Sequence, residues 1–222
     1  MFFLLPAFLL RPFNPKNTKL FFHVVERVAK VLLNIHVHIE NPEALKNNDP
    51  AVLVGNHQHN FDVITVCKLY QCLIVVLAKY ELGLIPIFGQ FYVLGGNILV
   101  KRGNRKKAMK SMDKLEEKIR SKGLKVLVFP EGHRNREHEL QPFKKGAYYT
   151  ALKTGVPLIP FSVSQFVYCK YPLKGFERLD IYIKVHEPIS VEGKTQADIP
   201  ELISLSRKKI EEGILELNKK YQ

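Results

Sequence analysis

Short apolar runs, separated by turns and helical segments, constrain the fold of this chain more than any other feature of its sequence. Four of these runs predict buried strands, at residues 51–54, 73–78, 98–100 and 124–129. Strands that alternate with helices predict an α/β domain, in which helices cover both faces of a mostly parallel sheet. Three more strands are predicted at 36–40, 156–163 and 179–185, and an amphipathic helix over 199–221 closes the chain. The prolines of the 156–163 strand are expected at its edges, because proline cannot donate to a sheet ladder.

The composition limits the size and the class of the fold. With 222 residues, 46% of them hydrophobic, the chain is long enough for one globular domain with a sizeable core. The net charge of +13 predicts an anionic partner: nucleic acid, a membrane surface or a phosphorylated substrate. Nucleic-acid readers interleave exposed aromatics with cations, whereas the aromatics here lie mostly inside apolar runs, so we expect no nucleic-acid partner. Three cysteines form no disulfide framework and no metal spacing, which fits a reducing compartment: Cys67, Cys72 and Cys169.

The first 35 residues predict a membrane-associating segment. Residues 1–10 are nearly all apolar, but as a helix they span only ~15 Å, about half of a bilayer's hydrocarbon core. Three cations follow at once, and an apolar plug beside cations is typical of a chain that lies in the membrane interface. Residues 20–35 repeat apolar side chains at three- and four-residue steps, which predicts an amphipathic helix. The alternative is an N-terminal arm that packs on the core of the main domain, residues 36–222.

A histidine and an aspartate follow the first buried strand. His57 is predicted in the turn after residues 51–54, and Asp62 in the first turn of the next helix. A carboxylate on one ring nitrogen fixes the imidazole tautomer and leaves the other nitrogen free to take a proton. Two alternatives stay open. Asp62 is also a favourable acid at a helix N-terminus, with Asn60 as the cap. His57, His59 and Asp62 also resemble half of a two-metal hydrolase site, although the other histidines form no matching cluster.

Charged residues also follow the later strands. In a parallel α/β sheet, sites form just beyond the carboxyl ends of the strands. Four groups stand at such positions: His57, Lys79, Arg102 and the run from Glu131 to Arg134. The sequence therefore predicts one pocket with a histidine–acid dyad and several cations. Of these, Lys79, Arg102 and Arg134 are suited to bind a phosphate, unless each is only a solvated surface charge.

Four motif blocks carry a resemblance to a known family. Residues 56–62 match NHx4D, residues 129–134 match FPEGTR, and residues 156–160 match a VPIIP block. Between them, residues 96–102 run from a glycine through apolar residues to an arginine. In this order the blocks resemble the glycerophospholipid acyltransferase family, in its bacterial 1-acylglycerol-3-phosphate branch, over about residues 36–190. His133 departs from the pattern, because the family usually has threonine there.

The resemblance implies an O-acyltransferase of phospholipid biosynthesis, with residues 36–222 as the acyltransferase domain. His57, oriented by Asp62, would deprotonate the sn-2 hydroxyl of lysophosphatidic acid. That oxygen would attack the thioester of acyl-CoA or acyl-carrier protein and give phosphatidic acid. The acyl donor is a substrate, and neither a cofactor nor a metal is expected. The alternatives are another lysolipid acceptor and a metal-dependent hydrolase.

The resemblance also assigns the remaining site residues and a location. Arg102 and Arg134 would hold the substrate phosphate with Lys79 as a third contact, while Glu131 and Gly132 would complete the same phosphate-binding pocket. A basic enzyme with an apolar N-terminus would lie on an anionic membrane surface. We therefore expect the protein at the cytoplasmic face of the inner membrane.

Overall fold

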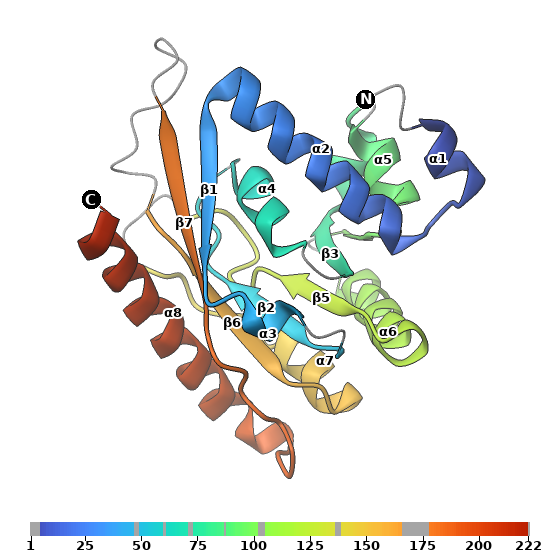
Figure 1. Ribbon diagram of the computed structural model, residues 1–222. Coiled ribbons are helices and arrows are strands. Elements are labelled where there is room, and N and C mark those ends of the chain that lie inside the picture. The colour runs from blue at the N-terminus through green and yellow to red at the C-terminus, as the bar shows by residue number, and fades with distance from the viewer. Residues whose placement is uncertain are drawn as a thin grey trace.

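A twisted sheet of seven strands forms the centre of the computed structural model, which describes residues 5–46, 49–59, 61–70, 73–86, 88–101, 105–135, 139–165 and 178–221 (Figure 1). The strand order is β1-β7-β6-β2-β5-β3-β4. All neighbouring strands are parallel except β6 and β7, which are antiparallel. The strands are β1 (Ile35–Glu40), β2 (Val52–Gly55), β3 (Ile74–Lys79), β4 (Ile98–Val100), β5 (Lys125–Val128), β6 (Leu158–Val163) and β7 (Leu179–Val185). This architecture confirms the predicted α/β fold class.

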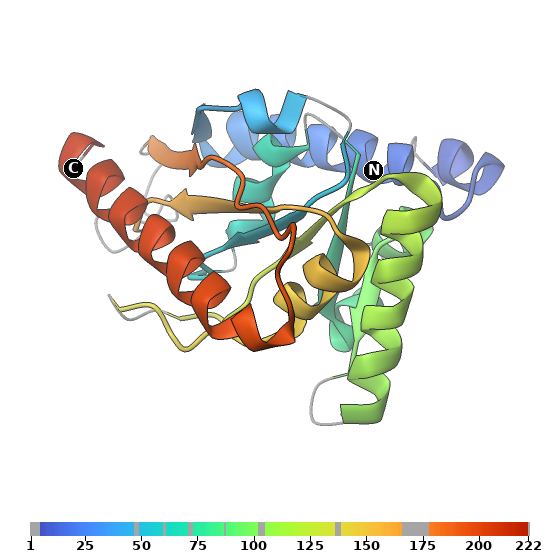
Figure 2. The same cartoon turned by 90° about the horizontal axis from the view of Figure 1, so that it is seen from below.

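Helices cover both faces of the sheet (Figure 2). One face carries α1, α2, α4 and α5, and the opposite face carries α6, α7 and α8, as the two separate buried clusters show. The helices are α1 (Leu5–Leu10), α2 (Pro15–Leu33), α3 (Glu43–Lys46), α4 (Asp62–Thr65), α5 (Phe88–Leu94), α6 (Arg105–Lys122), α7 (Gly146–Thr154) and α8 (Ile199–Tyr221). Short 3-10 helices stand at η2 (Val66–Leu69), η3 (Tyr80–Leu84) and η6 (Gln196–Asp198).

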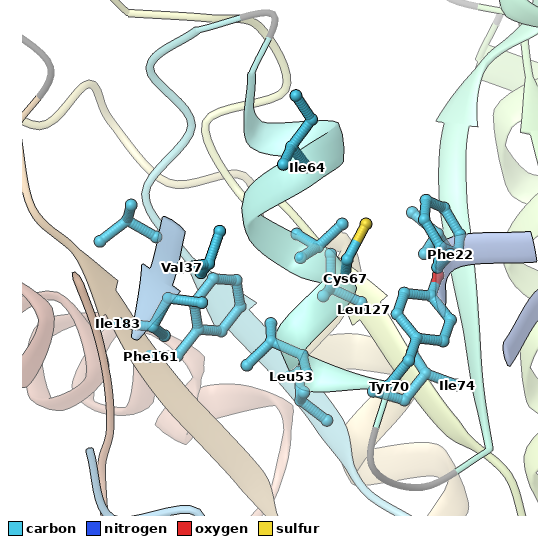
Figure 3. Close-up of a cluster of buried hydrophobic side chains, with 14 of the residues drawn as sticks. Phe22, Val37, Leu53, Ile64, Cys67, Tyr70, Ile74, Leu127, Phe161 and Ile183 are labelled. Carbon is cyan, nitrogen blue, oxygen red and sulfur yellow. The ribbon is translucent and has the colours of Figure 1, made fainter. Parts of the chain in front are cut away.

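The central strands are buried on both faces, which explains why their sequences are continuous apolar runs rather than alternating ones. In β2, Leu53 packs in the cluster under α2 and α4, whereas Val52 and Val54 pack in the cluster under α7 and α8 (Figure 3). Cys67 is buried in the first cluster, where burial raises the pKa of its thiol well above the ordinary value. This confirms Cys67 as a small core residue; the other two cysteines lie outside the described residues.

The N-terminal helices pack on the domain through aromatic side chains. Phe8 of α1 is fully buried and meets Phe91 of α5 edge to face, with ring centroids 4.8 Å apart. Phe21 of α2 stacks on the ring of Phe91, with centroids 5.6 Å apart. The hydrophobic core therefore continues across the predicted boundary at residue 35. In the described part of the chain, no helix combines the length and apolarity that crossing a bilayer requires.

The position of Pro160 differs from the expectation, because this residue lies inside β6 and β6 is an interior strand. Its carbonyl accepts a hydrogen bond from the backbone N–H of His186 at 2.9 Å, on the β7 side. The N–H and C=O of one strand residue point to the same side, so the missing N–H also faces β7. The antiparallel ladder starts only at Phe161, opposite Val185. Proline is tolerated here because its position lies at the end of that ladder.

A half-buried imidazole, that of His186, joins β6 and the loop after β7 to α8. The Nε2 atom of His186 lies 2.7 Å from the hydroxyl of Ser162, which also donates to the carbonyl of Ile210 at 2.9 Å. Helix α8 comes this close because Gly213 has no Cβ; a methyl group there would overlap both Ser162 and His186. Burial, assisted by nearby lysine charges, lowers the pKa of His186 to about 4.

This lowered pKa predicts an acid-sensitive fold. Between about pH 6.5 and about pH 4 the unfolded chain binds a proton at His186 that the folded chain does not, so stability falls as the pH falls through this window. The loss amounts to at most about 3 kcal/mol, since one pKa unit corresponds to ~1.36 kcal/mol and solvent around the partly exposed ring screens some of the shift. Urea unfolding should show a flatter pH dependence for His186→Gln than for the wild type. His23→Gln, at an exposed position on α2, should leave the wild-type slope, and equal slopes for all three proteins would contradict the assignment.

Candidate active site

A cavity of about 1100 Å³ opens at the carboxyl ends of β2, β3 and β5. The parallel strands bring to this one edge side chains that are up to about eighty positions apart in the sequence. Among its lining residues are five of the predicted site residues: His57, Asp62, Lys79, Gly132 and Arg134. Arg102 lies outside the described residues. The cavity is large enough for a lipid headgroup and part of an acyl chain, because ligand pockets commonly measure ~300–1,000 Å³.

His57 and Asp62 form the predicted dyad. The Nδ1 atom of His57 lies 2.5 Å from Oδ2 of Asp62, in the loop that joins β2 to α4. The carboxylate accepts the Nδ1 proton, which assigns the tautomer in which Nε2 carries a free lone pair. The imidazole also stacks on the ring of Phe129, with centroids 4.2 Å apart and 14° between the planes. Both contacts fix the ring, and a base with a fixed orientation is what proton transfer requires.

Asp62, at the start of α4, holds the backbone of the loop that carries His57. Besides the imidazole, its Oδ2 atom accepts the backbone N–H groups of Gln58 at 2.8 Å and His59 at 3.0 Å. Its other oxygen, Oδ1, is buried and has no hydrogen-bond partner among the described residues. Helix α4 begins at Asp62, and the preceding Phe61 offers no side-chain cap. Asp62 is therefore a helix N-terminal acid and a dyad partner at once. Asn60, the alternative cap, lies outside the described residues.

Both main-chain groups of His57 are held by residues that follow β5. Its backbone N–H donates to Oε1 of Glu131 at 2.8 Å, and its carbonyl accepts from the backbone N–H of Asn135 at 2.7 Å. The second carboxylate oxygen of Glu131 accepts from the backbone N–H of Gln141 at 3.1 Å. Burial raises the pKa of Glu131, while these N–H donors act in the opposite direction. Glu131 thus ties the histidine loop to two segments after β5.

This position differs from the one predicted for Glu131 in the phosphate pocket. The residue is 1% exposed and is not among the residues that line the large cavity. A carboxylate would also repel a phosphate. The physical reason for its burial is the pair of backbone N–H groups from His57 and Gln141, which a buried carboxylate can satisfy and a neutral apolar side chain cannot.

The start of the histidine loop is fastened to β6. The side-chain amide of Asn56 accepts from the backbone N–H of Val163 at 2.8 Å and donates to the Val163 carbonyl at 3.0 Å. The Asn56 side chain thereby makes the two hydrogen bonds that a backbone residue of β2 would make to β6 if the strand continued. Gly55 lies against the ring of Phe161, and a Cβ at Gly55 would overlap that ring. The sheet is thus extended by one side chain, and the next residue, His57, faces the cavity.

The cavity has a cationic end and an apolar arm. The cationic end is at Arg134, which forms no ion pair with any described residue. Lys79, directly before η3, also lines the cavity and is paired with Glu81 at 3.4 Å. The apolar arm extends under α2, η3 and α5, where it is lined by residues such as Phe22, Val63, Val76, Leu82, Ile85, Phe88 and Tyr92. An amphiphile with an anionic head and an apolar tail fits this division.

Lys144, which no motif of the sequence singled out, also lines the cavity. The residue stands just before α7, where the positive end of the helix dipole disfavours a cation. A lysine at that unfavourable position was therefore the signal in the sequence for a functional role.

For the metal alternative, the described ranges contain no group of three or more His, Cys, Asp or Glu side chains arranged to hold an ion. The Nδ1 atom of His59 accepts from the backbone N–H of Phe61 at 3.3 Å.

Comparisons with known proteins agree with this geometry. The family model described as "Acyltransferase" matches residues 36–164. The chain is 34% identical over 211 residues to the 1-acyl-sn-glycerol-3-phosphate acyltransferase of Salmonella typhimurium, which covers 95% of this chain and 85% of the relative. The values for the protein of the same name from Escherichia coli are the same. Human 1-acyl-sn-glycerol-3-phosphate acyltransferase beta is 32% identical over 194 residues, covering 87% of this chain and 70% of the relative.

A solved structure shares the fold. The 1-acyl-sn-glycerophosphate (LPA) acyltransferase PlsC from Thermotoga maritima superposes with a TM-score of 0.74 at 24% sequence identity, covering 99% of this chain and 88% of that chain. The family model spans more than half of the chain, and the bacterial relatives are about one third identical over nearly all of it. Together with the histidine–aspartate dyad, these matches show that the chain belongs to the acyltransferase family.

Proposed function

We propose that this protein is a 1-acyl-sn-glycerol-3-phosphate acyltransferase, which transfers an acyl group from an acyl thioester to the sn-2 hydroxyl of lysophosphatidic acid. The observation that carries the proposal is the hydrogen bond of 2.5 Å between His57 and Asp62 inside a cavity that also holds Arg134 and Lys79. A base beside cations suits an acceptor with both a hydroxyl and a phosphate. The names of the bacterial and human relatives point to the same acceptor.

The chemistry follows from the tautomer of the dyad. Nε2 of His57 takes the hydroxyl proton as the acceptor oxygen attacks the carbonyl carbon of the thioester. A carbon–oxygen bond forms, the carbon–sulfur bond then breaks, and the departing thiolate takes the proton back from the imidazolium. The carboxylate of Asp62 balances the positive charge of the imidazolium in the interval. The steps balance without an acyl-enzyme, and the donor is acyl-CoA or acyl-carrier protein.

Binding of the two ends of the acceptor positions its hydroxyl. Arg134 and Lys79, which both line the cavity, contact the phosphate, and Arg102 is the third residue that we assign to it. The apolar arm under α2, η3 and α5 receives an acyl chain. Holding a reacting group in this way lowers the activation barrier by up to ~7–11 kcal/mol in favourable cases. The acceptor phosphate therefore contributes to rate as well as affinity.

A purified-enzyme assay tests the function directly. Acyl-CoA and acyl-carrier protein of several chain lengths should each be offered with lysophosphatidic acid, with other lysophospholipids and with a monoacylglycerol that lacks the phosphate. We expect the highest kcat/KM for lysophosphatidic acid. Faster turnover of another lysolipid would assign the protein to that acceptor, and hydrolysis that needs an added divalent metal would favour the hydrolase alternative.

We also propose that the protein works on an anionic membrane surface, at the cytoplasmic face of the inner membrane. Support comes from apolar side chains that α1 and α2 leave exposed: Leu10 at 86%, Val31 at 78% and Leu32 at 63%. Exposed cations stand next to Leu10 at Arg11 and next to Val31 at Lys30. Each cation near such a surface adds about 1 kcal/mol of attraction.

This proposal predicts weaker vesicle binding when the apolar surface of the N-terminal helices is made polar. Exchange of Leu10 and Leu32 for serine should lower the partition coefficient by roughly tenfold or more, since burying one leucine contributes ~1.5–3 kcal/mol. Sedimentation with phosphatidylglycerol vesicles measures it. Leu215→Ser is the matched control, because Leu215 on α8 is also 65% exposed. Equal losses in the control and the double variant would remove the N-terminal helices from the membrane contact.

A further inference from the structure

The side chain of Lys144 lies across Gly132 at the cationic end of the cavity. A Cβ added at Gly132 would overlap the ammonium of Lys144 and would lie 2.9 Å from its Cε and 3.0 Å from its Cδ. The backbone of Gly132 has a φ of +77°, a conformation that side-chain-bearing residues rarely adopt. Both features of this glycine leave room for the lysine, which reaches the same cavity as His57 and Arg134.

The loop that carries Lys144 is anchored on three sides. The backbone N–H of Lys144 donates to the carbonyl of Pro130 at 2.8 Å, directly beside Glu131. The carboxylate of Glu131 accepts the backbone N–H of Gln141 and also holds the N–H of His57. One carboxylate thus connects the loop of the base with the loop of the lysine. Lys144 is therefore fixed relative to the dyad at its backbone.

The third anchor comes from α8. The guanidinium of Arg207 donates to the carbonyls of Leu140 at 2.7 Å and Gln141 at 2.9 Å. Its central carbon also stands 5.6 Å from the ring centroid of Phe143, within the range of a cation–π contact. Phe143 is buried, so the residue before Lys144 is held in the core while the lysine itself is exposed toward the cavity.

The charge of Lys144 is not balanced within the described part of the chain. No described Asp or Glu carboxylate lies within 4.0 Å of its ammonium, whereas Lys79 at the same cavity is paired with Glu81. Glu131, an acid that follows β5, directs its carboxylate at two backbone N–H groups instead. The first turn of α7 lines the cavity beside Lys144 and adds the positive end of its dipole. An anion bound here would offset these positive charges.

We propose that Lys144 binds the phosphate of the acceptor together with Arg134, which lines the same cavity. This inference rests on the proposed function, because lysophosphatidic acid supplies the phosphomonoester. A lysine ammonium acts on phosphate as a compact charge with three donors, whereas arginine binds in a fixed two-point geometry. Arg134 and Lys144 therefore have different roles. Arg134 orients the phosphate, and Lys144 neutralises its charge beside the histidine loop.

A matched pair of variants tests the role of Lys144. Lys144→Gln removes the charge at the cavity, and Lys145→Gln removes the next lysine, which is exposed but does not line the cavity. We expect Lys144→Gln to raise the KM for lysophosphatidic acid about tenfold, equivalent to ~1.4 kcal/mol. The KM for the acyl donor and the kcat/KM for a monoacylglycerol, which has no phosphate, should stay within about twofold. Lys145→Gln should match the wild type, and Lys144→Arg should keep most of the affinity.

Equilibrium binding separates this inference from the proposed reaction. Calorimetry with a short-chain lysophosphatidate and the matching monoacylglycerol measures phosphate recognition whether or not transfer occurs. A wild-type protein that binds the lysophosphatidate but transfers no acyl group would overturn the proposed function, and the tenfold loss in Lys144→Gln would still support this inference. Equal affinity in both glutamine variants, or a selective rise in the donor KM, would overturn the inference. The second result would place a donor phosphate at Lys144 instead.

Discussion

Replacement of His57 by alanine is expected to abolish acyl transfer while the protein stays folded. The imidazole is the one group in the described cavity whose free nitrogen is directed by a carboxylate, through the 2.5 Å contact with Asp62. Loss of a general base lowers kcat by ~10²–10⁴. The backbone anchors of this loop, from Glu131 and Asn135, do not involve the imidazole and should persist. Initial rates with saturating substrates and thermal unfolding of the same samples measure both halves of the prediction.

His59→Ala is the matched control for this prediction. His59 lies two residues further along the same loop and also lines the cavity, but its ring is not bonded to Asp62. In the general-base mechanism, the His59 variant should keep activity within about one order of magnitude, well above His57→Ala. A hydrolase that uses both histidines as metal ligands would lose activity equally in the two variants. Retained turnover in His57→Ala would end the general-base mechanism altogether.

Replacement of Asp62 by asparagine is expected to cost about 10²–10⁴ in kcat with the side-chain shape unchanged. The amide oxygen can still accept from the backbone N–H groups of Gln58 and His59, so the loop is kept. The negative charge that stabilises the imidazolium is lost, because the amide that replaces the carboxylate is neutral. Single-turnover rates measure the chemical step apart from product release.

The same variant has a predicted effect on stability. The Oδ1 atom of Asp62 is buried without a partner in the described part of the chain, and an amide nitrogen there would be an unsatisfied donor. Such a group costs about 1–3 kcal/mol, which denaturant unfolding can resolve. Asp113→Asn provides the control, because Asp113 is exposed on α6 and carries the same chemical change. If Asp113→Asn lost as much activity as Asp62→Asn, the effect would reflect net charge rather than the dyad.

Local patterns predicted most of the fold. The expected strand over 179–185 and the expected helix over 199–221 coincide with β7 and α8, because their periodicity and end signals lie within the segments themselves. Pro160 is the exception. Its place inside β6 depends on where the antiparallel ladder to β7 starts, at the pair of Phe161 and Val185, which are more than twenty positions apart in the sequence.

In the active site, too, local contacts could be predicted from the sequence and long-range contacts could not. The sequence by itself determined the dyad, because His57 and Asp62 stand five residues apart in a single turn, and local geometry suffices to bring them together. It also determined that cations would gather near them, since parallel strands deliver their carboxyl ends to one edge. Only the tertiary structure decided the roles of Glu131 and Lys144. A carboxylate becomes a buried anchor only when two backbone N–H groups from distant loops converge on it, and a lysine enters the cavity only across a neighbouring glycine. Contacts of this kind join segments that are far apart in the chain, so the spacing of residues within the sequence does not predict them.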